Sequence, residues 1–351
     1  MTGLPEPIRA AFRRQAESCH GLGSPFTAGL CTLLADRLDP QASAFARRIA
    51  GWPTERAVDD ALALRACGAL HALARSGDAP DLRAAYPPVA ADAETLWPAI
   101  SAALADHDAR LTDWLSSPPQ TNEPKRSGAL LGALAILSAE TGLAIDLLEL
   151  GASAGLNLSL DRFAYALGIA ERPGDPDVAV TIRCAWRGAA PDPFTPLSIA
   201  HRAGCDRNPL DPGRPEDRER LLAYVWADQQ ERLATTAAAL EAAAIAPWRV
   251  EKADAADWVE AALAARPVPG RVTVLAHTIV WQYLPPETKA RIEAALAEAG
   301  ARATREAPLA RVAMEADGQR GSAALTLTTW PGGATRALGR ADYHGRWVDW
   351  A

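Results

Sequence analysis

The stretch "LLELGASAGLNLSL", from Leu147 to Leu160, decides the fold, because it joins a short apolar run to a loop with two glycines. The run "AIDLLEL" from Ala144 stops at Gly151 and is typical of a buried parallel strand. Residues 151–155 fit G-x-S-x-G, the sharp turn that presents a nucleophilic serine. Together with Glu149 they also fit E-x-G-x-x-x-G, in which glycines let the backbone approach a ligand. Ser153 is therefore either a nucleophile or a small residue beside a cofactor.

The elements on either side of this stretch indicate the fold class. Residues 1–118 carry apolar side chains at three- and four-residue spacing, which predicts an N-terminal all-helical domain. Residues 119–351 alternate strand-like and helical segments, which predicts a doubly wound, mostly parallel α/β sheet that ends in a hairpin. The expected strands after the glycine loop are 178–186, 248–254, 271–280, 309–315 and 322–330, and residues 156–169 have helical spacing.

The position of the glycine loop among the predicted strands bears on whether Ser153 is a nucleophile. In an α/β-hydrolase the serine elbow follows the fifth strand, whereas here the preceding region is almost wholly helical. In a nucleotide-type doubly wound domain the glycine loop follows the first strand. The hydrolase alternative, with Ser153 as nucleophile, retains two features: "HGLG" from His20 to Gly23, and His344 late enough to complete a Ser…Asp…His order.

The loop resembles the one on which class I methyltransferases hold S-adenosylmethionine. That resemblance implies that Glu149 contacts the methionine amino group, and that Gly151 and Gly155 allow the turn and close backbone approach. Ser153 replaces the usual middle glycine and still lacks bulk. Asn157 would cap the following helix or touch the ligand. The alternative is an ordinary glycine-bearing turn between a strand and a helix.

Two acidic segments resemble further cofactor contacts of that class. "GCDRNPLD", residues 204–211, is similar to the end of the second strand, where an acid, here Asp206, accepts hydrogen bonds from the ribose hydroxyls. Asp206 lies 55 residues after Gly151, whereas about 20 is usual. Either an insertion lies between them, or the segment forms only an Asx-type turn. "VEKADAADWV", residues 250–259, resembles the acidic loop that contacts adenine, through Asp254 or Asp257.

Candidates for the acceptor side follow the next strand. His277 in "TVLAHTIVWQYLPPET" is a candidate general base with a pKa near neutrality, or else a hydrogen-bonded core residue. Tyr283 is the second catalytic candidate, and with Trp281 it would wall a substrate pocket. The sequence lacks the N/D-P-P-Y signature of amino-group methylation on nucleic-acid bases.

Two polar clusters complete the candidate site. "QTNEPKR" precedes the helix that leads into the first strand, and its Asn122, Glu123 and Arg126 are substrate-binding candidates. Glu123 and Arg126 alternatively form only a helix cap and a charge pair. "YHGRWVDW" near the C-terminus adds His344 as a substrate-side candidate.

Composition limits the partner classes. The 351 residues have a formal net charge of -7 and no basic run, so nucleic acid is not an expected partner. The five cysteines include no C-x-x-C pair, and we expect no metal site. No stretch approaches 18 apolar residues and no signal peptide is evident, so we expect a cytoplasmic protein without a membrane span. A small molecule is the expected partner, and the oligomeric state is not readable.

Segments along the whole chain together resemble an uncharacterised bacterial family classed as a domain of unknown function. This resemblance to the family implies no activity. The second half of the chain, however, resembles a class I S-adenosylmethionine-dependent methyltransferase. The resemblance implies a methyltransferase-like fold and methyl transfer to an unknown small or medium-sized acceptor in the cleft between the two domains. The alternative is a non-enzymatic protein that binds a nucleotide-like ligand or a partner on the same fold. The segments are 120–131, 147–163, 204–211, 225–233, 275–285 and 344–347.

Overall fold

The computed structural model describes residues 3–264 and 267–351. The chain divides into two compact units, which we call the helical unit (Met1–Thr121 and Glu219–Ala234) and the sheet unit (Asn122–Arg218 and Thr235–Ala351). The chain passes between the units three times: after Thr121, within α9 (Pro215–Ala223) and within α10 (Gln230–Ala244). Within the described residues, none of the helices combines the length and the apolar character needed to cross a membrane.

The helical unit confirms the predicted helical N-terminal region. Its core is formed by the apolar side chains that recur every three or four residues, such as Ile8 and Phe12 on the first helix. Residues 219–234 belong to the same unit, since His71 Nδ1–H donates to Ala223 O at 3.0 Å and Phe26 N–H donates to Asp228 Oδ2 at 2.9 Å. Its helices are α1 (Glu6–Gly21), α2 (Pro25–Arg37), α3 (Ala44–Ala50), η1 (Thr54–Arg56), α4 (Leu62–Ser76), α5 (Pro80–Ala85), α6 (Ala93–Asp106) and α7 (Asp108–Trp114).

The sheet unit contains a nine-stranded, mostly parallel sheet in the order β5-β12-β11-β10-β9-β8-β1-β6-β7. The strands β7, β6, β1, β8 and β9 are all parallel, and β10, β11 and β12 extend them as an antiparallel meander. The bounds are β1 (Ala144–Leu150), β5 (Ala185–Gly188), β6 (Ile199–Asp206), β7 (Val250–Lys252), β8 (Arg271–Thr278), β9 (Leu309–Glu315), β10 (Ala323–Trp330), β11 (Ala334–Ala341) and β12 (Trp347–Trp350).

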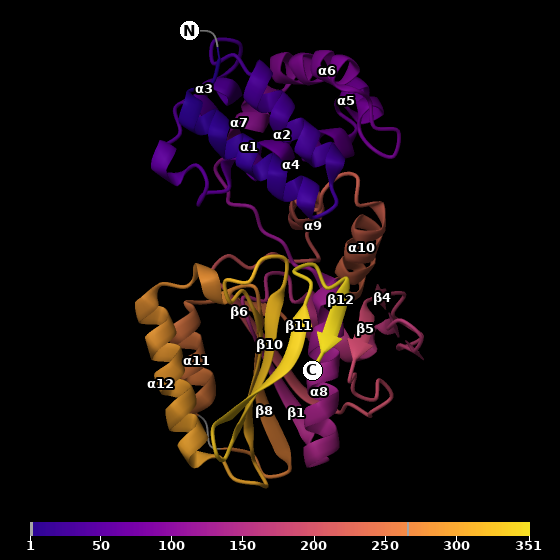
Figure 1. The fold of residues 1–351 in the computed structure, drawn as a ribbon, viewed down its shortest axis with the longest axis vertical. Coiled ribbons are helices and arrows are strands. Elements are labelled where there is room, and N and C mark those ends of the chain that lie inside the picture. Colours follow the sequence, from indigo (N-terminus) through magenta and orange to yellow (C-terminus); the bar gives the residue numbers. More distant parts are fainter. Residues whose placement is uncertain (1–2, 265–266) are drawn as a thin grey trace. The chain divides into compact units, whose positions relative to one another are not determined.

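Helices cover both faces of the parallel strands. Figure 1 shows α11 (Ala255–Ala264) and α12 (Pro286–Arg302) on one face and α8 (Ser127–Thr141) on the other. After β1 the chain adds β6 and β7 on one side, and then crosses to add β8 and β9 on the other side. The strand order therefore reverses between β1 and β8, and this switch point places their carboxyl ends beside each other.

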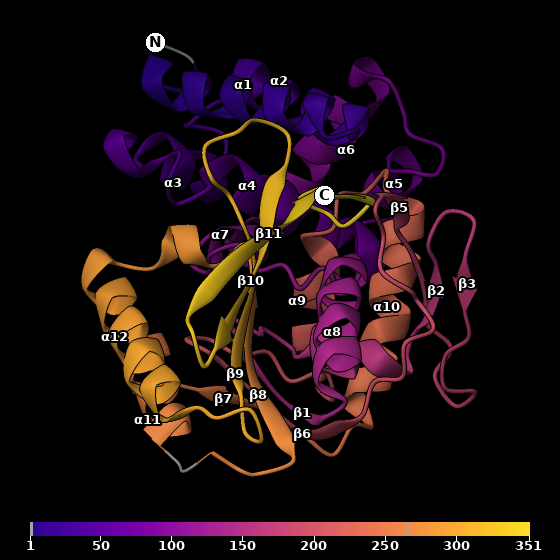
Figure 2. The same ribbon diagram turned by 60° about the horizontal axis from the view of Figure 1, so that its bottom comes forward.

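An insertion separates β1 from β6 and accounts for the long spacing in the sequence. It contains β5 and a small sheet of β2 (Ala164–Ala166), β3 (Glu171–Arg172) and β4 (Thr181–Arg183), which lies away from the centre of the main sheet in Figure 2. The prediction of a helix over 156–169 was wrong, because a 3-10 helix, η3 (Leu156–Arg162), is followed there by β2. Residues 309–315 and 322–330 form the predicted hairpin, and β11 and β12 extend it.

Candidate functional site

The glycine loop begins directly after β1 and has three residues in the left-handed region. The φ angles of Gly151, Ser153 and Gly155 are 69°, 55° and 74°. A Cβ on Gly151 would lie 2.6 Å from Val280 Cγ2, so both its φ and its surroundings require glycine. A glycine in the middle of the loop would take this conformation without strain, whereas Ser153 takes it despite its Cβ.

The carboxylate of Asp206 fixes this loop from the neighbouring strand. Asp206 ends β6, which pairs in parallel with β1. Its Oδ2 accepts the N–H of Ser153 at 3.0 Å, and its Oδ1 accepts the N–H of Asn208 at 2.9 Å. The structure therefore brings Asp206 to the glycine loop despite the insertion, and its first role here is to position that loop.

Asn122 holds the second half of the loop. Its Oδ1 accepts the N–H groups of Ala154 at 3.2 Å and Leu156 at 3.0 Å. The next residue, Glu123, is buried, and its Oε1 accepts Lys125 N–H at 3.1 Å at the start of η2 (Pro124–Arg126). Glu123 is therefore the capping residue of η2, and Asn122 is a residue that positions the glycine loop.

The two polar clusters, which are more than 200 residues apart in the sequence, meet at this edge. Arg126 Nε–H donates to Tyr343 O at 2.9 Å, and its Nη1 donates to Thr278 O at the end of β8 at 3.4 Å. Gly345 packs directly against the Lys125 backbone, which leaves no room for a Cβ. The segment that carries His344 thus lies beside η2.

A group of buried polar atoms lies behind the glycine loop. Glu149 is 3% exposed, and its Oε1 accepts an amide N–H of Asn157 at 3.4 Å. Glu149 Oε2, Asn157 Oδ1 and Ser153 Oγ are buried without a hydrogen-bond partner in the part of the chain that the structure describes. Burial raises the pKa of Glu149 to about 8, although the Asn157 amide and the Arg126 guanidinium act in the opposite direction. At neutral pH this carboxyl is therefore mostly protonated.

A cavity of about 350 Å³ opens beside the start of the loop, at the carboxyl ends of β1, β6 and β7. It is lined by Gly151, Asp206 and Asp254, three of the predicted cofactor-binding residues, and by Tyr283. Asp254 Oδ1 accepts Ala256 N–H at 2.9 Å, at the first turn of α11. The Tyr283 side chain is 74% exposed.

His277 is part of a saturated hydrogen-bond network. Its ring is fully buried, Nδ1–H donates to Glu315 Oε1 at 2.7 Å, and Nε2 accepts Arg311 Nε–H at 2.9 Å. Burial lowers its pKa, against the effect of Glu315. Trp281 stacks on the imidazole with ring centroids 5.3 Å apart, and the Arg311 guanidinium lies 4.4 Å from its ring centroid. These contacts favour the alternative that His277 is a hydrogen-bonded core residue. Trp281 packs against the same network.

Ser153 has none of the surroundings of a serine nucleophile. It is 3% exposed, and its Oγ has no hydrogen bond to any described residue. Its loop also follows the first strand of the sheet rather than the fifth. Among residues 3–264 and 267–351, no three His, Cys, Asp or Glu side chains are grouped to hold a metal ion.

Comparisons with known proteins identify a family. A family model described as "Uncharacterized protein conserved in bacteria (DUF2332)" matches residues 9–350. No curated protein and no solved structure matches the chain.

Proposed function

The chain belongs to this family of uncharacterised bacterial proteins, and from its own site we propose that it is an S-adenosylmethionine-dependent methyltransferase. The acceptor would be a small or medium-sized molecule. The observation that carries the proposal is the position of Gly151, Asp206 and Asp254 around one cavity at the switch point of the sheet.

The order of the candidate residues along the sheet supports this proposal. Ligands of open α/β sheets bind outside the carboxyl ends of the strands, where the strand order reverses. The loop after β1 would hold the methionine part, Asp206 after β6 the ribose, and Asp254 after β7 the adenine. The parallel strands β7-β6-β1-β8-β9 suit a methyltransferase-like domain, whereas the meander that follows is a feature of this chain.

The buried polar atoms behind the loop fit the amino-acid part of the cofactor. Buried polar atoms normally have partners, and each one without a partner needs an explanation. Asn157 Oδ1 is an acceptor, and Glu149 Oε2 becomes one when the carboxyl ionises, in a site otherwise closed to water. An ammonium group offers three donors, and its positive charge would favour the ionised form of Glu149.

The cavity fits the nucleoside part. Its volume of about 350 Å³ lies within the range of small-molecule sites. A carboxylate accepts about four hydrogen bonds, and Asp206 uses two of them on the backbone of its own unit. The remaining acceptor sites suit a pair of ribose hydroxyls.

The bound cofactor would supply an activated methyl group, so the protein needs mainly to align the acceptor and exclude water. Tyr283, at the mouth of the cavity, is the candidate acceptor contact, and Arg126 and His344 lie on the η2 side of the same edge. His277 is assigned no proton transfer, because both of its nitrogens already have partners.

The binding step is tested by titrating the whole protein with S-adenosylhomocysteine. We expect micromolar affinity, about -8 kcal/mol, and a loss of at least tenfold in Asp254→Asn. Asparagine still caps a helix, so this change preserves α11 and alters only the oxygen facing the cavity. Asp206→Asn is a less specific test of ligand binding. One of its two oxygens would become an NH₂ group facing the N–H of Ser153 or Asn208, so the change would also disturb the loop.

The catalytic step needs a separate measurement. A methyltransferase releases S-adenosylhomocysteine when S-adenosylmethionine and its acceptor are both present. Binding without such release across fractionated bacterial metabolites would favour the non-enzymatic alternative. Absence of binding to either molecule would refute the proposal.

A further inference from the structure

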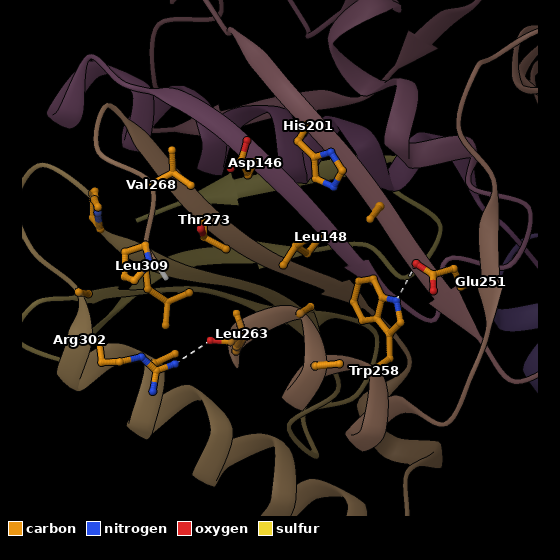
Figure 3. A pocket seen from close by; sticks show the side chains of 18 residues that line it. Asp146, Leu148, His201, Glu251, Trp258, Leu263, Val268, Thr273, Arg302 and Leu309 are labelled. Atoms are coloured by element: carbon orange, nitrogen blue, oxygen red, sulfur yellow. Dashed lines mark hydrogen bonds between the residues drawn. The ribbon is translucent and has the colours of Figure 1, made fainter. Parts of the chain in front are cut away.

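A second cavity lies at the opposite edge of the sheet unit, between the sheet and the C-terminal ends of α11 and α12. It measures about 460 Å³ and is larger than the cavity at the glycine loop. Figure 3 shows Leu148, Trp258, Leu263 and Leu309 around it. Its walls are mainly apolar, which is typical of sites that bind small organic molecules.

One row of polar side chains interrupts these apolar walls. Asp146 on β1 pairs in register with His201 on β6 and with Thr273 on β8. The three side chains point to the same face of the sheet, and all three line the cavity, where Figure 3 labels them. Central parallel strands are normally apolar on both faces, so a carboxylate here needs an explanation.

The carboxylate of Asp146 is largely buried, and its ion pair with Arg271 engages Oδ1. Its side chain is 14% exposed, and its Oδ1 accepts Arg271 Nη1–H at 3.2 Å, from an arginine that is 42% exposed. A second acid, Glu251, lines the cavity and accepts Trp258 Nε1–H at 3.2 Å. The sheet side of the cavity thus presents two carboxylates and an imidazole.

The cation within the cavity lies at its other end. Arg302 on α12 lines that end, and its Nη2–H donates to Leu263 O at 2.7 Å. In Figure 3 this pair lies well away from Asp146 and His201. Arg302 therefore lies apart from the polar row, where Asp146 is already paired with Arg271.

We propose that this cavity is a second small-molecule site, which takes an organic amine with its cationic head at Asp146 and His201 and its apolar body against Leu148 and Leu309. An amine supplies the donors that the polar row accepts, and its hydrocarbon part is removed from water. The site is independent of the proposed methyltransferase activity, because it shares no lining residue with the cavity at the glycine loop.

The test compares three probes of similar size: phenethylamine, neutral 2-phenylethanol and anionic 3-phenylpropionate. Ligand-observed NMR on the whole protein at millimolar concentration should show binding of the amine in preference to the other two. Asp146→Asn should weaken amine binding roughly tenfold, the equivalent of one good charge pair. Ala262→Phe should abolish it by filling the cavity from α11.

The controls locate the amine. Thermal unfolding of each variant establishes that the fold is retained. If Asp146→Asn fails to fold, Thr273→Val, which removes a hydroxyl from the polar row, is used in its place. Glu149→Gln should leave amine binding unchanged. Equal binding of the three probes, or a loss in Glu149→Gln but not in Ala262→Phe, would overturn the proposal.

Discussion

Replacing Glu149 by glutamine should stabilise the protein without ligand, and more so as the pH rises. The substitution keeps the size of the protonated acid, and its Oε1 can still accept the Asn157 amide. The pKa of the buried carboxyl is raised from 4.5 to about 8. Between these values the unfolded chain is ionised while the folded protein holds a proton, so the stability of the wild type falls as the pH rises.

The size of the effect follows from the two pKa values. At 1.36 kcal/mol per pKa unit, the difference between 4.5 and about 8 corresponds to about 5 kcal/mol above pH 8. The same relation gives a loss of about 1 kcal/mol in the free energy of unfolding of the wild type at pH 5. The advantage of Glu149→Gln should therefore grow by about 4 kcal/mol from pH 5 to pH 9, less whatever local opening relieves.

Urea unfolding of both proteins at pH 5, 7 and 9 measures this difference. The matched control is Glu298→Gln, the same chemical change on a side chain of α12 that is 79% exposed. Parallel pH profiles for Glu149→Gln and the wild type would refute the reasoning. A gain of equal size in Glu298→Gln would show that the change in net charge, and not burial, is responsible.

Three further substitutions test the scaffold of the site, each by urea unfolding. Asn122→Ala should cost about 2–4 kcal/mol, because two backbone N–H groups of the glycine loop lose their acceptor; an effect below 1 kcal/mol would contradict this role. Gly151→Ala should cost about 1–3 kcal/mol for the left-handed backbone, and more for the contact with Val280; full stability would show that the loop relaxes. Glu315→Ala should cost about 3 kcal/mol, since His277 loses its acceptor, and an unchanged midpoint would argue against a structural network.

The order of elements was predictable from the sequence because local patterns carry it. The apolar run ending at Gly151 predicts β1, and the alternation after it predicts a mostly parallel sheet, as the structure confirms. Residues 156–169 misled the prediction because buried apolar side chains recur there every three or four residues, at Leu156, Leu160, Phe163 and Leu167, although the chain forms η3 and then β2. The strands β11 and β12 were missed, since much of β11 is exposed and β12 has only four residues.

The candidate site was predictable only in part, because side-chain partners come from distant strands. The sequence singled out His277 but not Glu315 and Arg311, which engage both of its ring nitrogens. A signal was present: β9 reads "LARVAME", in which the two charged residues lie four apart on one face of an otherwise apolar strand. Asp146 within "AIDLLEL" is a similar signal for the second cavity.

Calorimetry with S-adenosylhomocysteine at pH 7, in two buffers of different ionisation enthalpy, tests the central claim most directly. If the amino group of the ligand binds at Glu149, a carboxyl that is protonated beforehand must ionise. Binding should then release about one proton per ligand, and Glu149→Gln should abolish the release. Absence of binding, or binding with the same heat in both buffers, would contradict the assignment of this site.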